Sequence, residues 1–155
     1  MRLTEFTDHA LRLLMYLGAH RGRMATIDEI ALQYGISRNH LAKVVNELAA
    51  SGMIQTVRGR CGGVWLTREP RDIRLGEVVT QTEPNFHMAQ CFGAAAAACP
   101  FSPDCRLRAS LADATRAYLD ELNRVTLADL LPAAPPATSA AQPSGSGHCH
   151  QPRTP

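Results

Sequence analysis

The fold is decided by residues 26–48, which read TIDEIALQYGISRNHLAKVVNEL. Thr26 and Glu29 have the spacing of a capping box, in which each side chain binds a free backbone N–H at the start of a helix. Gly35 is expected to end this helix in the left-handed conformation, which a side chain would penalise. Ser37 then caps a second helix, whose apolar stripe is Leu41, Val44, Val45 and Leu48. Two helices joined by a short glycine-containing turn predict a helix-turn-helix.

The flanking sequence extends this motif into a winged helix. Upstream, apolar side chains at helical spacing predict an amphipathic helix over residues 5–20, and they are Phe6, Ala10, Leu13, Leu14 and Leu17. Downstream, the strand-like runs 53–57 and 64–67 flank the turn RGRCGG at 58–63, which is the pattern of a β-hairpin. The predicted fold class is therefore mainly α, a winged helix-turn-helix with a small β-hairpin wing.

The rest of the chain divides into further segments. Residues 75–82 predict a short helix that completes a winged-helix domain over residues 1–82, and residues 83–106 form a loop rich in cysteine. Residues 107–131 predict a long helix and a closing turn capped by Thr126, because apolar residues recur every three or four positions at Leu107, Leu111, Ala114, Tyr118 and Leu122. So much apolar surface at the end of a small domain indicates a dimerisation helix. Residues 132–155 have the composition of a disordered tail.

Composition places the chain among globular proteins and favours the cytoplasm. Hydrophobic residues make up 45% of the 155 residues, which excludes wholesale disorder. Residues 1–7 lack the apolar stretch of a secretory signal, and no window approaches about eighteen uninterrupted apolar residues. The chain also shows no nucleophile–base pair and no glycine-rich phosphate loop, so we expect no enzymatic activity.

Charge and helix position together predict a surface that binds double-stranded DNA. Residues 1–70 hold nine Lys and Arg against six Asp and Glu, whereas residues 71–131 hold six against eight. A recognition helix presents hydrogen-bonding side chains near its amino end, which enters the major groove, while wing arginines suit phosphates or the minor groove. The predicted contacts are Arg38, Asn39, His40, Lys43 and Asn46 on the helix, with Arg58 and Arg60 on the wing. The alternative for each residue alone is a solvated polar position.

Three cysteines, Cys91, Cys99 and Cys105, fall within fifteen residues of the loop. In a reducing cytoplasm such a group indicates metal ligands rather than disulfide partners. Their intervals of seven and five residues match neither the paired cysteines of a zinc ribbon nor the close run of a bacterial ferredoxin. Longer intervals suit an iron–sulfur cluster, whose iron atoms are spread over several ångströms.

The residues by themselves leave the rest of the site open. Candidates for a fourth ligand are His87, Asp104, Cys61, Cys149 or a residue from a second copy of the chain. Cysteines that merely pack, a regulatory thiol pair and a zinc-stabilised loop are the alternatives to a cluster. Cys61 in the wing is either an oxidisable thiol or an idle surface cysteine, and the triplet at 148–150 either binds a metal or has no specific role.

Several motifs resemble the Rrf-type winged-helix regulators. They are MRLT at 1–4 leading into TDHALR at 7–12, YGISRNHL at 34–41, and VRGRCGG at 57–63. The resemblance covers residues 1 to about 131. Within the family, SRNHL at 37–41, the cysteine loop and TLADLL at 126–131 are most like the nitric-oxide-sensing repressors. Cys61 is a departure, because the wing usually carries glycine or a polar residue there.

The resemblance implies a homodimer with one 4Fe-4S cluster per subunit, held by Cys91, Cys99 and Cys105. Such a dimer would bind a near-palindromic operator until nitric oxide attacks the cluster. The resemblance also implies that an aspartate from the first helix of the other subunit completes the site, and the matching position is Asp8. The cluster-biogenesis branch has a histidine where this chain has Arg108. An iron-responsive or redox-responsive regulator of the same family remains the alternative.

Overall fold

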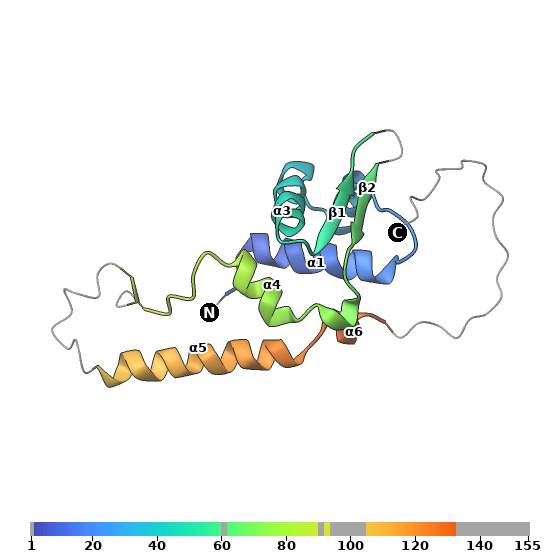
Figure 1. Ribbon diagram of the computed structural model, residues 1–155. Helices are drawn as coiled ribbons and strands as arrows, with labels where there is room; N and C mark the ends of the chain where they lie inside the picture. The colour runs from blue at the N-terminus through green and yellow to red at the C-terminus, as the bar shows by residue number, and fades with distance from the viewer. Residues whose placement is uncertain (1, 60–61, 90–91, 94–104, 133–155) are drawn as a thin grey trace.

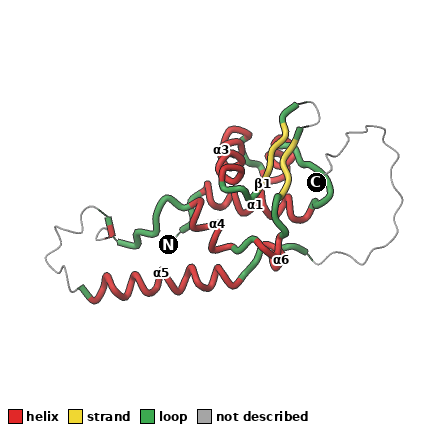
Figure 2. Tube along the Cα trace, in the orientation of Figure 1, coloured by secondary structure: helices red, strands yellow, loops and turns green. Residues whose placement is uncertain are grey.

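The computed structural model of the protein describes residues 2–59, 62–89, 92–93 and 105–132. The helices are α1 (Glu5–Ala19), α2 (Ile27–Tyr34), α3 (Arg38–Ala50), α4 (Leu75–Thr82), α5 (Arg106–Arg124) and α6 (Leu127–Leu130). The strands are β1 (Ile54–Val57) and β2 (Gly63–Leu66), followed by the 3-10 turn η1 (Pro70–Asp72). Figure 2 shows that helices make up most of the described chain, beside one hairpin. The mainly α fold class is confirmed.

The helix-turn-helix forms where the sequence predicts it, because both helices begin at a hydroxyl cap. Thr26 Oγ1 accepts a hydrogen bond from the Glu29 N–H at 3.2 Å, and Ser37 Oγ accepts one from the His40 N–H at 3.2 Å. Gly35 ends α2 with a φ of 64°, in the left-handed region. These local signals therefore set the angle at which α3 leaves α2.

One half of the predicted capping box is wrong. The Glu29 carboxylate accepts hydrogen bonds from the Tyr16 hydroxyl and the Arg23 guanidinium instead of from the backbone N–H of Thr26. A charged partner gives a carboxylate a stronger hydrogen bond than a neutral backbone N–H does. Contacts with other parts of the fold thus replace the local capping-box interaction at Glu29.

The core lies where α1, α2 and α3 meet the base of the hairpin. Figure 1 shows α1 running across the base of both α3 and the strands. The apolar stripes that the sequence predicts are buried, with no exposed surface at Ala10, Leu13, Leu14, Ile30, Leu41, Val44 and Leu48. Burial of one face of α3 fixes the rotation of that helix and leaves its polar face outward.

The wing is an antiparallel hairpin attached to the rest of the domain at two places. β1 and β2 pair in a register that runs from Ile54 opposite Leu66 to Val57 opposite Gly63. At the base, the Met53 N–H donates to the Leu48 carbonyl of α3 at 3.0 Å. On its other edge, β2 forms an isolated bridge through Val64 to Ala25 in the loop between α1 and α2.

The closing turn α6 packs into the same core as the first helices. The Leu75 N–H donates to the Val125 carbonyl at 3.0 Å, and the Leu127 N–H donates to the Ile73 carbonyl at 2.8 Å. Leu127 has no exposed surface. The two ends of α5 therefore differ, since the carboxyl end is held at the core.

Helix α5 contacts α4 and extends past it, as Figure 1 shows. No side chain of α5 is buried in a single copy of the chain. Leu107 is largely exposed, and Leu111, Tyr118 and Leu122 are half-buried. No helix within the described ranges is both long and apolar enough to cross a membrane.

Candidate nucleic-acid interface and cluster site

The predicted DNA-contacting residues of α3 lie together on its exposed side. Ser37 caps the helix, so Arg38, Asn39 and His40 occupy its first turn. Lys43 and Asn46 follow Asn39 at intervals of four and three residues, which places the three on one face. All five side chains are exposed. The arrangement presents donors and acceptors at the end of the helix that a major groove admits.

Arg38 is held by a weak partner in the free protein. Its Nη1 lies 3.2 Å from Asp28 Oδ1 on α2, and the two side chains are 70% and 65% exposed. An exposed pair of this kind contributes at most about 1 kcal/mol. Asp28 can therefore orient Arg38 without preventing it from turning to a base or a phosphate.

His40 connects the recognition helix to α1. Its ring stacks on the ring of His9, with centroids 6.3 Å apart and planes inclined by 24°. His9 directly follows Asp8, the residue that the family resemblance places at the cluster. A shift of the amino end of α1 would therefore be transmitted to the first turn of α3 through these two rings.

The wing places Arg58 at its exposed tip. Gly59 turns the chain there with a φ of 114°, and the Gly62 N–H donates to the Gly59 carbonyl at 2.9 Å. Arg60 and Cys61 lie outside the described residues. Of the two predicted wing contacts, the structure thus describes Arg58 alone, as an exposed cation.

Asp8 lies on the surface of α1 and has a partner in its own subunit. Its Oδ2 accepts a hydrogen bond from Arg12 Nε at 2.8 Å, and its side chain is 50% exposed. The Arg12 guanidinium also lies 5.9 Å from the centroid of the Tyr34 ring. Asp8 is accessible from outside the subunit, as a ligand supplied to a second copy must be.

Cys105 is the residue immediately before α5, where it occupies the N-cap position. Its thiol is free and half-buried. The first turn of a helix favours negative charge, which suits a thiolate ligand. Cys91 and Cys99 lie outside the described residues, as does Asp104. Among the described residues no three His, Cys, Asp or Glu side chains are grouped as a metal site.

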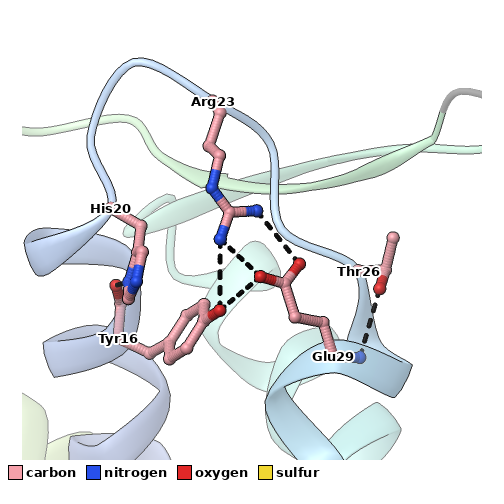
Figure 3. A network of polar contacts seen from close by, with 5 residues as sticks. All are labelled: Tyr16, His20, Arg23, Thr26 and Glu29. Atoms are coloured by element: carbon pink, nitrogen blue, oxygen red, sulfur yellow. Dashed lines mark hydrogen bonds and ion pairs between the residues drawn. The ribbon is translucent and has the colours of Figure 1, made fainter. Parts of the chain in front are cut away.

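A polar network that the sequence patterns did not predict joins the end of α1 to the start of α2 (Figure 3). Arg23 Nη1 donates to Glu29 Oε2 at 3.0 Å, and Arg23 Nη2 donates to the Tyr16 hydroxyl at 3.2 Å. The Tyr16 hydroxyl in turn donates to Glu29 Oε1. Tyr16 and Glu29 are thirteen residues apart on different helices, so no local pattern could have paired them.

The network alters the acid–base properties of its members. The hydrogen bonds from Arg23 and then from Tyr16 lower the pKa of Glu29 from its ordinary value of 4.5 to about 2. Burial, followed by the bond to Glu29, raises the pKa of Tyr16. The unfolded chain binds more protons than the native one between these two Glu29 values, so the network stabilises the fold fully above pH 4.5 and is lost as the pH falls towards 2.

Glu29→Gln should therefore make the free energy of unfolding depend less on pH in the acidic range. Between about pH 6 and about pH 3, wild-type protein is expected to lose on the order of 1 kcal/mol more unfolding free energy than the variant, a value reduced for the solvent screening of a half-exposed pair. Urea unfolding at the two pH values measures the difference. Equal losses in both proteins would show that Glu29 is not selectively stabilised as the carboxylate.

Comparison with solved structures identifies the fold. The chain resembles the structure of IscR from T. potens with a TM-score of 0.66 and 25% identity, over 84% of this chain and 85% of that one. It resembles the structure of CymR, the global cysteine regulator of B. subtilis, with a TM-score of 0.67 and 20% identity, over 84% and 95%. The winged helix-turn-helix prediction is confirmed.

Sequence comparison identifies the family. The model of the Rrf2 family, described as iron-dependent transcriptional regulators, matches residues 3–133. The HTH-type transcriptional regulator NsrR of Bacillus subtilis (strain 168) is 46% identical over 132 residues, which cover 84% of this chain and 90% of that protein. NsrR of Geobacillus kaustophilus (strain HTA426) is 45% identical over the same shares. Its winged helix-turn-helix and these matches together make the chain a member of the Rrf2 family of iron-dependent transcriptional regulators.

Proposed function

We propose that this protein is a homodimeric repressor that acts in the cytoplasm, binds a near-palindromic DNA operator and senses nitric oxide through a 4Fe-4S cluster. The observation that carries the proposal is the position of Cys105 directly before α5 in an iron-dependent family, with Cys91 and Cys99 less than fifteen residues upstream. The resemblance of residues 37–41 and 126–131 to the nitric-oxide-sensing repressors indicates that nitric oxide is the molecule sensed.

The donor set fits an iron–sulfur cluster. Cys91, Cys99 and Cys105 supply thiolates, which are the usual ligands of such clusters. Asp8 from a second copy supplies a carboxylate, and its exposed pair with Arg12 holds it only weakly. When bound, the cluster provides iron that nitric oxide can attack. Without a bound cluster, Cys105 at the N-cap of α5 would no longer be held as a ligand.

The chain's own contacts offer a route from Cys105 to DNA. Helix α5 packs on α4, and α4 packs on α1. On the same route, the Glu83 carboxylate at the end of α4 accepts a hydrogen bond at 2.7 Å from the N–H of Thr4, which caps α1. The stacked rings of His9 and His40 then connect α1 to α3. A changed α5 would thereby shift the recognition helices, and half-site spacing tolerates little error.

The proposed division of labour follows the segments of the sequence. Residues 1–82 bind DNA, with Arg38, Asn39, His40, Lys43 and Asn46 facing the major groove and Arg58 and Arg60 facing phosphates. Residues 83–106 hold the cluster. Within residues 107–131, helix α5 forms the dimer contact, because Leu107, Leu111, Tyr118 and Leu122 keep apolar surface exposed in one copy. Residues 132–155 form a tail outside these functions.

The test uses protein purified without oxygen and a duplex selected by that protein from a random pool. The wild-type protein is expected to absorb visible light and to bind the duplex in a salt-sensitive manner. Added nitric oxide should bleach the absorption and weaken binding at least about tenfold, which corresponds to about 1.4 kcal/mol. Colourless protein that binds equally well with and without nitric oxide would exclude the proposal.

A second candidate is an iron-responsive regulator with the same cluster site, which the family description as iron-dependent favours. An iron chelator distinguishes the two. Release of the duplex by the chelator, with no response to nitric oxide, would favour the iron sensor. A colourless protein containing zinc would instead indicate that the loop is a structural zinc site.

A further inference from the structure

The loop between α1 and α2, residues 20–26, is held on both sides by side chains of other elements. Arg23 in this loop binds Tyr16 of α1 and Glu29 of α2 at once, as Figure 3 shows. Near its start, Arg21 pairs with Glu69, which lies between β2 and η1. The loop is thus a fixed element of the domain, placed by charged contacts.

The hydroxyl of Tyr16 is a rigid point in this arrangement. Tyr16 is only 7% exposed. Its ring stacks on His20 with centroids 4.1 Å apart, and the edge of the Tyr34 ring packs against it at 6.2 Å. These contacts pack the ring on two sides, so the bond from Arg23 is made to a hydroxyl on a buried ring.

Two residues beyond Arg23, the loop pairs with the wing. The Ala25 N–H donates to the Val64 carbonyl at 3.0 Å, and the Val64 N–H donates back to the Ala25 carbonyl at 2.8 Å. Neither residue has more than trace exposure. A Cβ at the neighbouring Gly63 would lie 2.8 Å from the Met24 Cβ, so glycine is required for this close approach. The loop therefore adds a single β-bridge to the outer edge of β2.

This bridge is a second attachment of the hairpin to the rest of the domain. A two-stranded hairpin alone is only marginally stable in water. The end of α3 holds β1, but the outer edge of β2 is held by Ala25. Fixing both edges of the hairpin sets its tilt, and the tilt sets where Arg58 at its tip lies.

We propose that Tyr16, Arg23 and Glu29 are positioning residues for DNA binding. They hold the loop so that Ala25 stays paired with Val64 of β2, and so direct Arg58 towards the phosphate backbone. The inference rests on the wing contact proposed above. In this scheme Arg23 acts through the wing, because Glu29 and Tyr16 together engage its guanidinium in the free protein.

A double-mutant cycle tests this role with the selected duplex and protein purified without oxygen. Tyr16→Phe and Arg23→Ala are each expected to weaken binding by about three- to tenfold. In an Arg58→Ala background the same changes should weaken binding by less than about twofold, because the side chain that they position is already absent. The salt dependence of binding should fall by the equivalent of about one phosphate in Arg58→Ala, and adding Arg23→Ala should lower it no further.

Two further variants complete the design. Arg71→Ala removes an exposed cation of η1 that is neither a proposed DNA contact nor part of the dimer helix, and should leave binding unchanged within about twofold. Glu29→Gln keeps the size of the side chain and carries the test if Arg23→Ala fails to fold.

Full losses from Arg23→Ala in the Arg58→Ala background would overturn the inference, since Arg23 would then act on DNA directly or through the whole fold. If Tyr16→Phe, Glu29→Gln and Arg23→Ala all bind as the wild type does while Arg58→Ala binds clearly more weakly, this inference is overturned and the proposed wing contact stands. Unchanged binding in Arg58→Ala would remove the proposed wing contact and this inference with it.

Discussion

Cys105→Ser protein, purified without oxygen, is expected to lack the visible absorption of the wild type and to bind the selected duplex at least about tenfold more weakly. Serine replaces a thiolate with a hydroxyl, which is not a usual ligand of iron–sulfur clusters. Because Cys105 directly precedes α5, the substitution would remove the link between the cluster and the helix that we propose as the dimer contact, without unwinding that helix. Iron and sulfide analysis, an absorption spectrum and a duplex titration measure the result.

The substitution removes the proposed cluster ligand and keeps a residue that can cap the helix. Cys105 occupies the N-cap of α5, and serine is among the residues that N-cap positions prefer, so α5 itself should begin as well as before. Cys61→Ser is the matched control, because Cys61 is a cysteine outside the proposed ligand set. A Cys105→Ser protein that keeps its colour and its response to nitric oxide would remove Cys105 from the site.

Leu48→Ala is expected to lower the free energy of unfolding by about 2–5 kcal/mol. Leu48 is fully buried in the last full turn of α3, and its carbonyl accepts the Met53 N–H at the base of the wing. The truncation removes apolar contacts and leaves a cavity under the recognition helix. Urea unfolding monitored by circular dichroism measures the loss, which is a large part of the stability of a small domain.

Leu32→Ala provides the control on the neighbouring helix. Leu32 lies on α2 and is 87% exposed, so the same chemical change should alter the unfolding free energy by no more than about 0.5 kcal/mol. Operator binding should weaken in Leu48→Ala under conditions that partly unfold it, and not in Leu32→Ala. Similar unfolding free energies for the two variants would contradict the position of Leu48 in the core.

The elements of the fold could be predicted from the sequence because each depends on neighbouring residues. The hydroxyls of Thr26 and Ser37 cap their helices as predicted, and Gly35 ends α2 in the left-handed region. The short helix expected at 75–82 is α4, Leu75–Thr82. Apolar spacing alone selected the buried face of α3, and the exposed polar face followed from it.

The candidate site could be predicted only in part. Exposure of Arg38, Asn39 and His40 follows from their place in the first turn of α3, which the sequence already indicates. The pair of Asp8 with Arg12 and the stack of His9 on His40 could not be predicted, because each depends on how side chains pack in the tertiary structure. The ligand roles of Cys91, Cys99, Cys105 and Asp8 stay predictions.

Caps, periodicity and spacing by themselves determined the helices and the hairpin of this protein, and the resemblance of its motifs indicated the family. Tertiary structure alone decided that Glu29 binds Arg23 and Tyr16, that Ala25 pairs with the wing, and that Leu127 returns to the core. The physical reason is how far apart along the chain the interacting residues lie. A cap or an apolar stripe depends on residues within about one turn, whereas these contacts join residues whose separation along the chain carries no repeating signal.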